Sequence, residues 1–186
     1  MKRVLDLVLV FVALMVFSIP LLLVWIAVRI SSRGPVIFWS DRVGYKNHIF
    51  RMPKFRTMRI DTPNVATHLL VGANSYLTPV GGFLRKSSLD ELPQLWSVLV
   101  GDMSFVGPRP ALYNQDDLIA MRTQKGVDAL IPGITGWAQV NGRDELDLST
   151  KVSLDAEYLQ RQSVHFDLYI LGLTVLKVFK SEGVSH

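Results

Sequence analysis

The 186-residue sequence contains no cysteine and only four histidines. The absence of cysteine excludes disulfides and thiolate metal sites, and it fits a folded portion that faces a reducing compartment such as the cytoplasm. The histidines form no cluster with metal-ligand spacing, so any metal here would take oxygen ligands. The chain also lacks a long basic tract and an RNA-binding aromatic signature, so no nucleic acid is expected as a partner.

Charge is also missing from the 22 residues between Leu7 and Val28. As a straight helix this run would extend roughly 33 Å, enough to cross the hydrocarbon core of a bilayer. Pro20 removes one backbone hydrogen bond near its centre and predicts a bend at Ser18–Pro20, where the Ser18 hydroxyl can satisfy a freed carbonyl. Because basic residues flank both ends, the charge pattern gives no direction of crossing. A kinked span and a re-entrant helix that leaves by the face it entered both fit.

The segments after this helix predict an α+β fold that is mostly helical. VIFWSD and HIFRM, separated by a loop with Gly44 and Asn47, are typical of a β-hairpin. The stretch from Asp61 to Pro79 predicts a loop with a short helix, and a polar helix follows between Pro110 and Ala129. Two helices are expected near the C-terminus: the first faces either the core or a membrane, and the second is suited to lying in a membrane interface beside the N-terminal helix. The first has apolar Leu148, Val152, Ala156 and Leu159 opposite Lys151, Asp155 and Glu157, and the second spans Phe166 to Lys180.

Adjacent carboxylates, Asp90 and Glu91, lie at a predicted helix start in the stretch RKSSLDELPQLWSVLVGDMSFVGPRP. Pro93 places them in the first turn, where a proline is tolerated. One interpretation is a capping box, in which Ser88 and Glu91 satisfy backbone donors at the helix start. The other is an anion site, in which the free N–H groups and neighbouring cations prepare a carboxylate to hold a divalent cation or to attack phosphorus.

Basic and polar side chains near this pair favour phosphate chemistry. Arg85 lies just upstream, and Arg109 lies downstream in a GPRP loop; a guanidinium fork suits a phosphate. Lys54 and Arg56, in the string KFRTMR after the hairpin, form either a solvated face or a contact to phosphates. PGITGWAQVNGR predicts a structured loop with short extended pieces, either a turn packed around Trp137 or a surface for a nucleotide. Its candidate contacts are Gln139, Asn141 and Arg143.

The strings KFRTM, SSLDELPQLW, GDMSFVGPRP and PGITGWAQVNGR occur in this order behind the proline-containing apolar helix. In this the chain resembles the bacterial monotopic phosphoglycosyl transferases, also called bacterial sugar transferases, in their minimal single-domain form. The resemblance covers nearly the whole chain except Asp61 to Leu77. It implies a re-entrant membrane helix over residues 1–30, and a membrane-associated catalytic domain with interfacial helices over residues 31–186. The expected location is the cytoplasmic face of the bacterial inner membrane.

The resemblance also implies a reaction. A sugar-1-phosphate passes from a UDP-sugar to a polyprenol phosphate such as undecaprenyl phosphate, with Mg²⁺ as cofactor, in the first membrane step of glycan assembly. UMP leaves, and the polyprenyl-diphosphate sugar is available to downstream glycosyltransferases. Asp90 is implied as the nucleophile of a ping-pong mechanism, Glu91 as its partner through Mg²⁺ or as a base, and Arg85 and Arg109 as phosphate ligands. An amino-sugar donor is slightly favoured.

Two residues depart from the family pattern. Ile131 stands before PGITG and Val100 before GDMSF, where family members often carry a basic residue. Both changes remove a positive charge near the expected site. They motivate the alternative hypothesis, a catalytically silent membrane-anchored scaffold that recruits other enzymes of glycan assembly.

Overall fold

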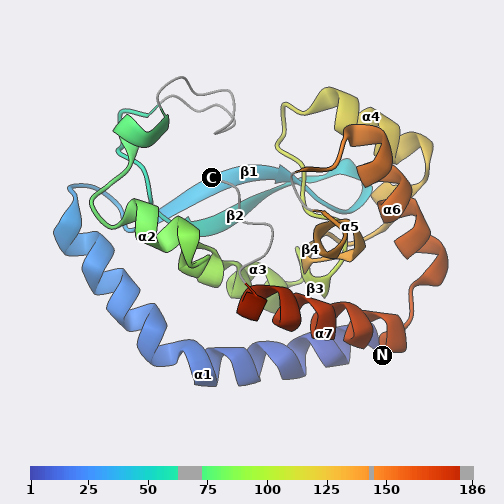
Figure 1. Cartoon of the computed structure of the whole chain (residues 1–186), viewed down its shortest axis with the longest axis horizontal. Helices are drawn as coiled ribbons and strands as arrows, with labels where there is room; N and C mark the ends of the chain where they lie inside the picture. Colours follow the sequence, from blue (N-terminus) through green and yellow to red (C-terminus); the bar gives the residue numbers. More distant parts are fainter. Residues whose placement is uncertain (63–72, 143–144, 181–186) are drawn as a thin grey trace.

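The computed structural model describes residues 1–62, 73–142 and 145–180, so part of the predicted loop from Asp61 to Pro79, and Arg143, lie outside the described residues. Helices dominate the described chain, as the sequence predicts, around two small two-stranded sheets (Figure 1). The α-helices are α1 (Lys2–Ser31), α2 (Gly81–Lys86), α3 (Leu95–Val100), α4 (Asp116–Gln124), α5 (Trp137–Val140), α6 (Leu148–Arg161) and α7 (Val164–Lys180). The short 3-10 helices are η1 (Tyr45–Asn47), η3 (Ala73–Tyr76), η4 (Leu89–Gln94) and η5 (Val127–Ala129).

The predicted β-hairpin is confirmed. Strands β1 (Ile37–Val43) and β2 (Ile49–Phe55) pair antiparallel, from Ile37 opposite Phe55 to Val43 opposite Ile49. A second sheet, of the parallel strands β3 (Ser104–Val106) and β4 (Gly133–Thr135), was not expected as a pair. It joins the GPRP and PGITG segments, which lie about 25 residues apart in the sequence.

Helix α1 is long and apolar enough to cross a membrane, yet it lies along the rest of the protein. It runs along the lower edge of the molecule in Figure 1 and changes direction part-way, with Pro20 inside it. The Ser18 hydroxyl donates to the carbonyl of Met15 at 3.0 Å. One narrow stripe is buried against the domain from one end of the helix to the other, and the rest of the surface is largely exposed. The buried residues are Asp6, Val10, Val24 and Val28.

The N-terminal end of α1 is tied to α6 and α7 by a group that we name the α1 anchor, formed by Lys2, Tyr158 and Asp167. The Lys2 ammonium donates to Asp167 Oδ2 at 2.7 Å, to the carbonyl of Val106 at 2.9 Å and to the Tyr158 hydroxyl at 3.2 Å. Tyr158 in turn donates to Asp167 Oδ1 at 2.6 Å. All three protons of the ammonium are therefore used.

The other end of α1 is capped by Arg56, which the sequence analysis assigned to substrate binding. Its guanidinium donates to the carbonyls of Ser32 and Arg33 at 2.9 and 2.6 Å and to the Ser32 hydroxyl at 2.8 Å. A helix C-terminus leaves carbonyls without intrahelical partners, and a cation there is favourable. Gly34 passes so close that an added Cβ would lie 2.3 Å from Arg56 Nη1. The observed contacts of Arg56 are thus structural.

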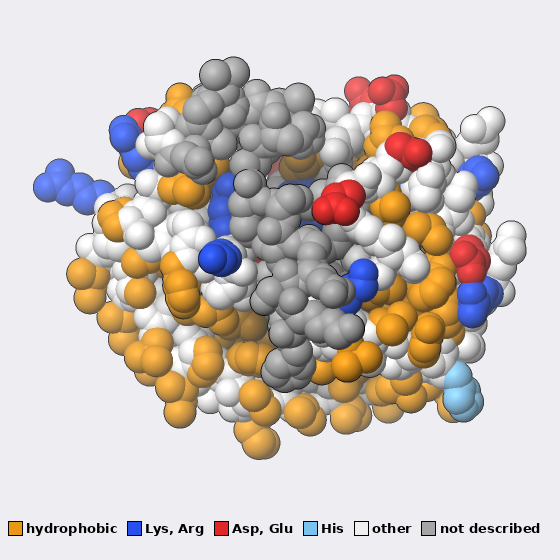
Figure 2. Space-filling model, viewed as in Figure 1, with side chains coloured by type: hydrophobic (Ala, Val, Ile, Leu, Met, Phe, Trp, Pro, Cys, Tyr) orange, Lys and Arg blue, Asp and Glu red, His pale blue; other side chains and the backbone are white. Residues whose placement is uncertain are grey.

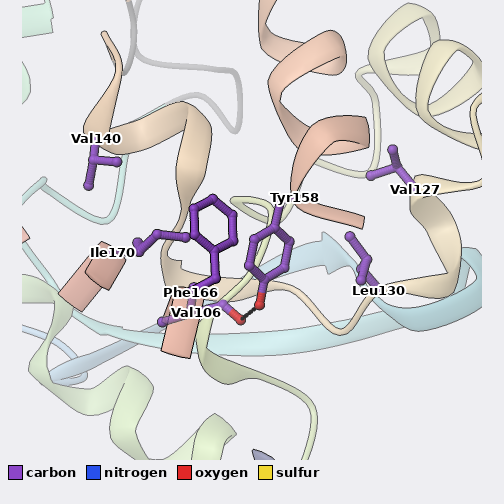
Figure 3. Close-up of a cluster of buried hydrophobic side chains, with 7 residues drawn as sticks. All are labelled: Val106, Val127, Leu130, Val140, Tyr158, Phe166 and Ile170. Atoms are coloured by element: carbon purple, nitrogen blue, oxygen red, sulfur yellow. Dashed lines mark hydrogen bonds between the residues drawn. The ribbon is translucent and has the colours of Figure 1, made fainter. Parts of the chain in front are cut away.

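The C-terminal helices face the core. Tyr158 of α6 and Phe166 and Ile170 of α7 are buried together with residues of β3, η5 and α5 (Figure 3). Asp155 was expected on the polar side of α6, but it is only 1% exposed and accepts two hydrogen bonds from Arg122. The expected pattern failed because a carboxylate paired with a buried arginine can replace an apolar residue on the inner face of a helix.

Exposed apolar side chains gather along one side of the molecule. Figure 2 shows them along the lower border, where α1 runs in Figure 1. Apolar residues at least half exposed on these helices are Val4, Val8, Phe11, Val12, Met15, Val16, Ile19, Leu22, Leu23 and Ile30 on α1, Phe83 on α2, Trp96 and Val100 on α3, and Tyr169, Val175 and Leu176 on α7. Contiguous apolar surface of this kind marks an interaction site, such as a membrane.

Candidate active site

The carboxylate pair lies in η4, at a helix start as predicted. Ser88, the residue immediately before η4, adopts a left-handed conformation with φ of 55°, and its side chain makes no capping hydrogen bond. The carboxylate of Glu91 does not turn back to the helix start either, because it is bonded to two cations. The capping-box interpretation is therefore wrong, and neither Ser88 nor Glu91 caps a backbone N–H group at the start of η4.

Glu91 is the centre of a group that we name the Glu91 cluster, formed by Lys54, Glu91 and Arg109. Oε1 of Glu91 accepts from Lys54 Nζ at 2.7 Å and from Arg109 Nη2 at 2.8 Å. Burial opposes ionisation, but the charges of Arg109 and Lys54 and their hydrogen bonds hold the pKa of Glu91 well below its usual value. Glu91 is thus a permanent anion and a poor general base at neutral pH.

The pKa of the neighbouring Asp90 is shifted in the opposite direction. The residue is 8% exposed, and burial raises its pKa, with a further rise from the charge of Glu91. The charges of Lys54 and Arg85 oppose that rise. Two adjacent carboxyls whose pKa values are driven apart have different chemical roles. Asp90 is the less stabilised anion and therefore the more reactive one.

Each cation reaches the pair from a different element. Lys54 lies near the end of β2, which packs on η4, and Arg109 comes from the GPRP loop after β3. Arg85, at the end of α2, donates from Nε to the Thr57 hydroxyl at 3.0 Å, and its charge acts on Asp90. Three of the basic residues expected at phosphates, Lys54, Arg85 and Arg109, are thus brought to the carboxylates. Arg56 is not.

The PGITG segment supports the loop that carries Arg109. Gly107 donates to the carbonyl of Thr135 at 2.8 Å, and Gly133 donates to the carbonyl of Pro108 at 2.9 Å. The backbones approach so closely that an added Cβ on Gly133 would lie 2.1 Å from Gly107 N, and one on Gly136 would lie 2.1 Å from Gly107 O. Glycine is required here for close packing. The first half of PGITGWAQVNGR contains the strand β4, which is one of the short extended pieces that the sequence predicts.

Its second half forms the one-turn helix α5, which the sequence did not predict. The Asn141 amide donates to the carbonyl of Trp137 at 2.8 Å on an exposed surface. Gln139 is 9% exposed, and neither atom of its buried amide has a hydrogen-bond partner among the described residues. The assignment of these two side chains to substrate binding stays a prediction.

Comparison with known proteins identifies the family. A family model described as bacterial sugar transferase matches residues 1–181. The chain belongs to the bacterial sugar transferase family. This confirms the family that the ordered motifs indicated.

Several relatives in the bacterial sugar transferase family have names that state a reaction. The chain is 40% identical to a UDP-glucose:undecaprenyl-phosphate glucose-1-phosphate transferase of Escherichia coli over 98% of its own length and 41% of the relative. It is 34% identical to an undecaprenyl-phosphate galactose phosphotransferase of Salmonella typhimurium, again over 98% of the chain and 41% of the relative. An uncharacterized sugar transferase, EpsL of Bacillus subtilis, is 40% identical over 100% of the chain and 91% of the relative. The chain thus spans less than half of the two relatives with a named reaction.

A further residue of this family member, Arg122, was missed by the sequence analysis. Its Nη1 donates to the carbonyl of Arg109 at 2.8 Å, while Nε and Nη2 donate to Asp155 at 2.9 and 2.7 Å. It therefore positions the Arg109 backbone and is itself held by α6. Arg42 was counted only as a basic residue flanking the membrane helix, but its charge acts on both Glu91 and Arg109. The sequence signal for this was its place on β1 two residues after Ser40, which puts the two side chains on the same face of the strand.

The donor set is compatible with Mg²⁺, although no group of three or more metal-ligating side chains occurs in the described parts of the chain. Mg²⁺ is commonly held by one or two carboxylates, with substrate phosphates and waters completing its octahedron. Asp90 and Glu91 supply this minimum. Among the residues that the structure describes, both hydrogen bonds to the Glu91 carboxylate end on Oε1, so Oε2 is placed for a further ligand.

Proposed function

We propose that the chain transfers a sugar-1-phosphate from a UDP-sugar to a polyprenol phosphate such as undecaprenyl phosphate and releases UMP. The observation that carries this proposal is the Asp90–Glu91 pair, in which Glu91 is fixed by two cations and Asp90 lies buried within reach of the charges of Lys54 and Arg85. The reactions named for the Escherichia coli and Salmonella typhimurium relatives support the same substrate class.

In the first step, an ionised Asp90 oxygen attacks the β-phosphorus of the donor. A phosphorus–oxygen bond to the carboxylate forms, the bond from that phosphorus to the bridging oxygen breaks, and UMP leaves with the electron pair. A carboxylate is a poor nucleophile towards a charged diphosphate unless the phosphate charge is neutralised. Arg85, Arg109 and Lys54 are the residues that would supply this neutralisation.

In the second step, a phosphate oxygen of the polyprenol phosphate attacks the same phosphorus. The acyl-phosphate bond breaks, the carboxylate of Asp90 is regenerated, and a polyprenyl-diphosphate sugar is released. No general base is needed if the acceptor reacts as its dianion, which agrees with the low pKa of Glu91. Glu91 instead orients Lys54 and Arg109.

Asp90 and Glu91 are the residues that would hold Mg²⁺, which would supply further charge neutralisation to the phosphates. On Glu91 the oxygen placed for this is Oε2, because Oε1 accepts from Lys54 and Arg109. Removal of divalent cations by EDTA should then abolish turnover while the free protein keeps its fold.

For the membrane, we propose a re-entrant α1 whose two ends lie on the cytoplasmic face of the inner membrane. The α1 anchor and the Arg56 cap fasten opposite ends of this helix to one domain. A full crossing would place these ends about 30 Å apart across the bilayer, so it would pull the domain into the hydrocarbon. The exposed apolar side chains of α1, α2, α3 and α7 would meet the lipid, which brings the lipid-linked acceptor to the site.

Single cysteines test this topology, since the chain has no native cysteine. Val4→Cys and Arg33→Cys place thiols at exposed positions near the two ends of α1 without removing Lys2. In sealed right-side-out and inverted vesicles, a membrane-impermeant reagent should label both from the cytoplasmic side. Labelling of the two cysteines from opposite sides would refute the re-entrant arrangement.

The reaction is tested with purified protein, Mg²⁺, a panel of UDP-sugars and undecaprenyl phosphate, with UMP release as the readout. Asp90→Asn should abolish release, by at least about a thousandfold, because no other residue replaces a missing nucleophile. Without acceptor, intact-mass measurement should show one sugar-phosphate on the wild-type chain and none on Asp90→Asn. A silent scaffold would give neither UMP nor adduct with any donor.

A further inference from the structure

Arg42 lies on the face of the hairpin that packs against the carboxylates. Directly paired residues of an antiparallel ribbon point to the same face, and every second residue along a strand does so too. Lys54 pairs with Phe38, which lies four residues from Arg42 along β1. Arg42 and Lys54 therefore share a face, and their side chains approach Glu91 from different places along the ribbon.

The guanidinium of Arg42 is held in a fixed orientation. Its Nε donates to the Ser40 hydroxyl at 3.0 Å, and its Nη1 donates to the carbonyl of Pro110 at 3.2 Å, next to Arg109. Within the described residues, Nη2 has no hydrogen-bond partner. Arg42 is thus preorganised with one donor group unused, which is the arrangement expected of a ligand-binding arginine.

Several positive side chains surround the single negative charge of Glu91. Burial and, next to it, the charge of Arg109 lower the pKa of Arg42 to about 10, against the opposing charge of Glu91. Arg42, Lys54 and Arg109 thus gather about one carboxylate, and Arg85 stands beside the other. Such crowding of like charge is unfavourable in the free protein, and a bound anion would relieve it.

We propose that Arg42 completes an anion subsite with Lys54 and Arg109, and that this subsite binds the α-phosphate of the donor, the phosphate that leaves in UMP. The assignment rests on the proposed function. Arg85 acts on Asp90, where the β-phosphorus is attacked, and Lys54 acts on both carboxylates, whereas Arg42 and Arg109 lie on the Glu91 side of the site, towards the neighbouring phosphate. Negative charge grows there as the bond to the bridging oxygen breaks, and fixed donors aimed at such charge lower the barrier.

A purely structural alternative is that Arg42 only supports the loop through Pro110. Ligand binding by full-length protein in nanodiscs, with EDTA present, separates the two roles. UMP is compared with uridine, which keeps the base and ribose but lacks the phosphate. Arg42→Gln should weaken UMP binding by about tenfold or more and leave uridine binding unchanged, because a charge-assisted hydrogen bond is lost only where the phosphate binds.

Arg42→Lys and Arg51→Gln serve as matched variants. The lysine keeps the charge and should retain part of the UMP affinity. Arg51 lies on the opposite face of the same hairpin, so Arg51→Gln should leave UMP binding unchanged. Wild-type affinity for UMP in Arg42→Gln, or an equal loss for uridine and UMP, would overturn the subsite. A wild-type protein that neither binds UMP nor releases it from any UDP-sugar would overturn the proposed function itself.

The two half-reactions give an independent readout. If Arg42 contacts only the leaving phosphate, Arg42→Gln should slow formation of the Asp90 adduct by tenfold or more. Discharge of the preformed adduct to undecaprenyl phosphate, after UMP is removed, should keep the wild-type rate. Equal slowing of both steps would indicate a displaced loop and reject the assignment.

Discussion

The α1 anchor and the Glu91 cluster are two semi-buried ion networks of similar composition, and they differ in how their charges are matched. In the α1 anchor one ammonium is bonded to one carboxylate, and a hydroxyl and a carbonyl take its remaining protons. In the Glu91 cluster two cations share one carboxylate oxygen, and the charge of Arg42 acts on the same group. The first network is matched one to one, whereas in the second the cations around Glu91 outnumber its carboxylate among the residues that the structure describes.

This difference separates a structural network from a functional one better than burial does. A paired and fully hydrogen-bonded buried ion pair has no capacity for another ligand. A cluster with more cations than anions is costly in the free protein and gains stability when an anion binds. By the same criterion Arg122 and Asp155, which are matched one to one, form a structural pair that holds the Arg109 backbone.

The sharpest way to break this comparison is to remove the carboxylate of the Glu91 cluster. Glu91→Gln should tighten metal-free binding of UMP, by about tenfold at low salt, because the cations then face no competing anion. Turnover with Mg²⁺ should nevertheless fall by about a hundredfold, since Lys54 and Arg109 lose the group that orients them. Titration of UMP in EDTA and an assay of UMP release measure the two effects.

Asp167→Asn is the matched control for that variant, since it removes the carboxylate of the α1 anchor. It should leave the affinity for UMP unchanged, because no anion binds at that network. Weaker binding of UMP by Glu91→Gln, or tighter binding by Asp167→Asn, would show that charge imbalance does not distinguish the two networks.

The α1 anchor should respond in stability instead of binding. Lys2→Met leaves Asp167, which is 1% exposed, without its counter-ion. Breaking a buried pair on one side costs about 3 kcal/mol, so the free energy of unfolding should fall by roughly that amount. Denaturant titration in detergent micelles measures the loss, and turnover of the folded fraction should be unaffected.

A smaller effect is expected when both members of the pair are replaced. Lys2→Met combined with Asp167→Leu should lie within about 1.5 kcal/mol of wild type, because an ion pair exchanged for apolar residues leaves no unpaired charge. With Asp167 replaced, the Tyr158 hydroxyl donates its proton to the carbonyl of Val106 instead, which lies 3.2 Å away. A double variant as unstable as Lys2→Met alone would mean that the anchor has a role other than charge matching.

The sequence predicted those features that depend on neighbours in the chain. The hairpin follows from β-branched residues around a turn, the length of α1 follows from its uncharged run, and the place of Asp90 and Glu91 at a helix start follows from Pro93. The family followed from motifs in a fixed order. Each of these signals is local or is read directly from the residues.

The sequence did not predict features whose partners lie far apart in the chain. Arg56 caps a helix that ends more than twenty residues earlier, and Lys2 meets Asp167 from the opposite end of the chain. The sequence placed Asp155 on the polar face of α6, because no residue near it in the chain indicates that Arg122 is its partner. Charge type alone does not tell a structural arginine from one that binds substrate, since both need a fixed guanidinium.

The smallest expected effect concerns the pH dependence of Asp90. Burial raises the pKa of this carboxyl, and Lys54 and Arg85 oppose the rise, so Arg85→Gln should raise it further. Asp90 must be ionised to attack phosphorus. The acid limb of the pH profile of kcat/KM should therefore lie above the pH of an ordinary aspartate in the wild type, and it should move to still higher pH in Arg85→Gln, by up to about one unit. Arg51→Gln, which removes an exposed cation far from the pair, should keep the wild-type limb; an acid limb that moves downward in Arg85→Gln would remove Asp90 as the group that titrates.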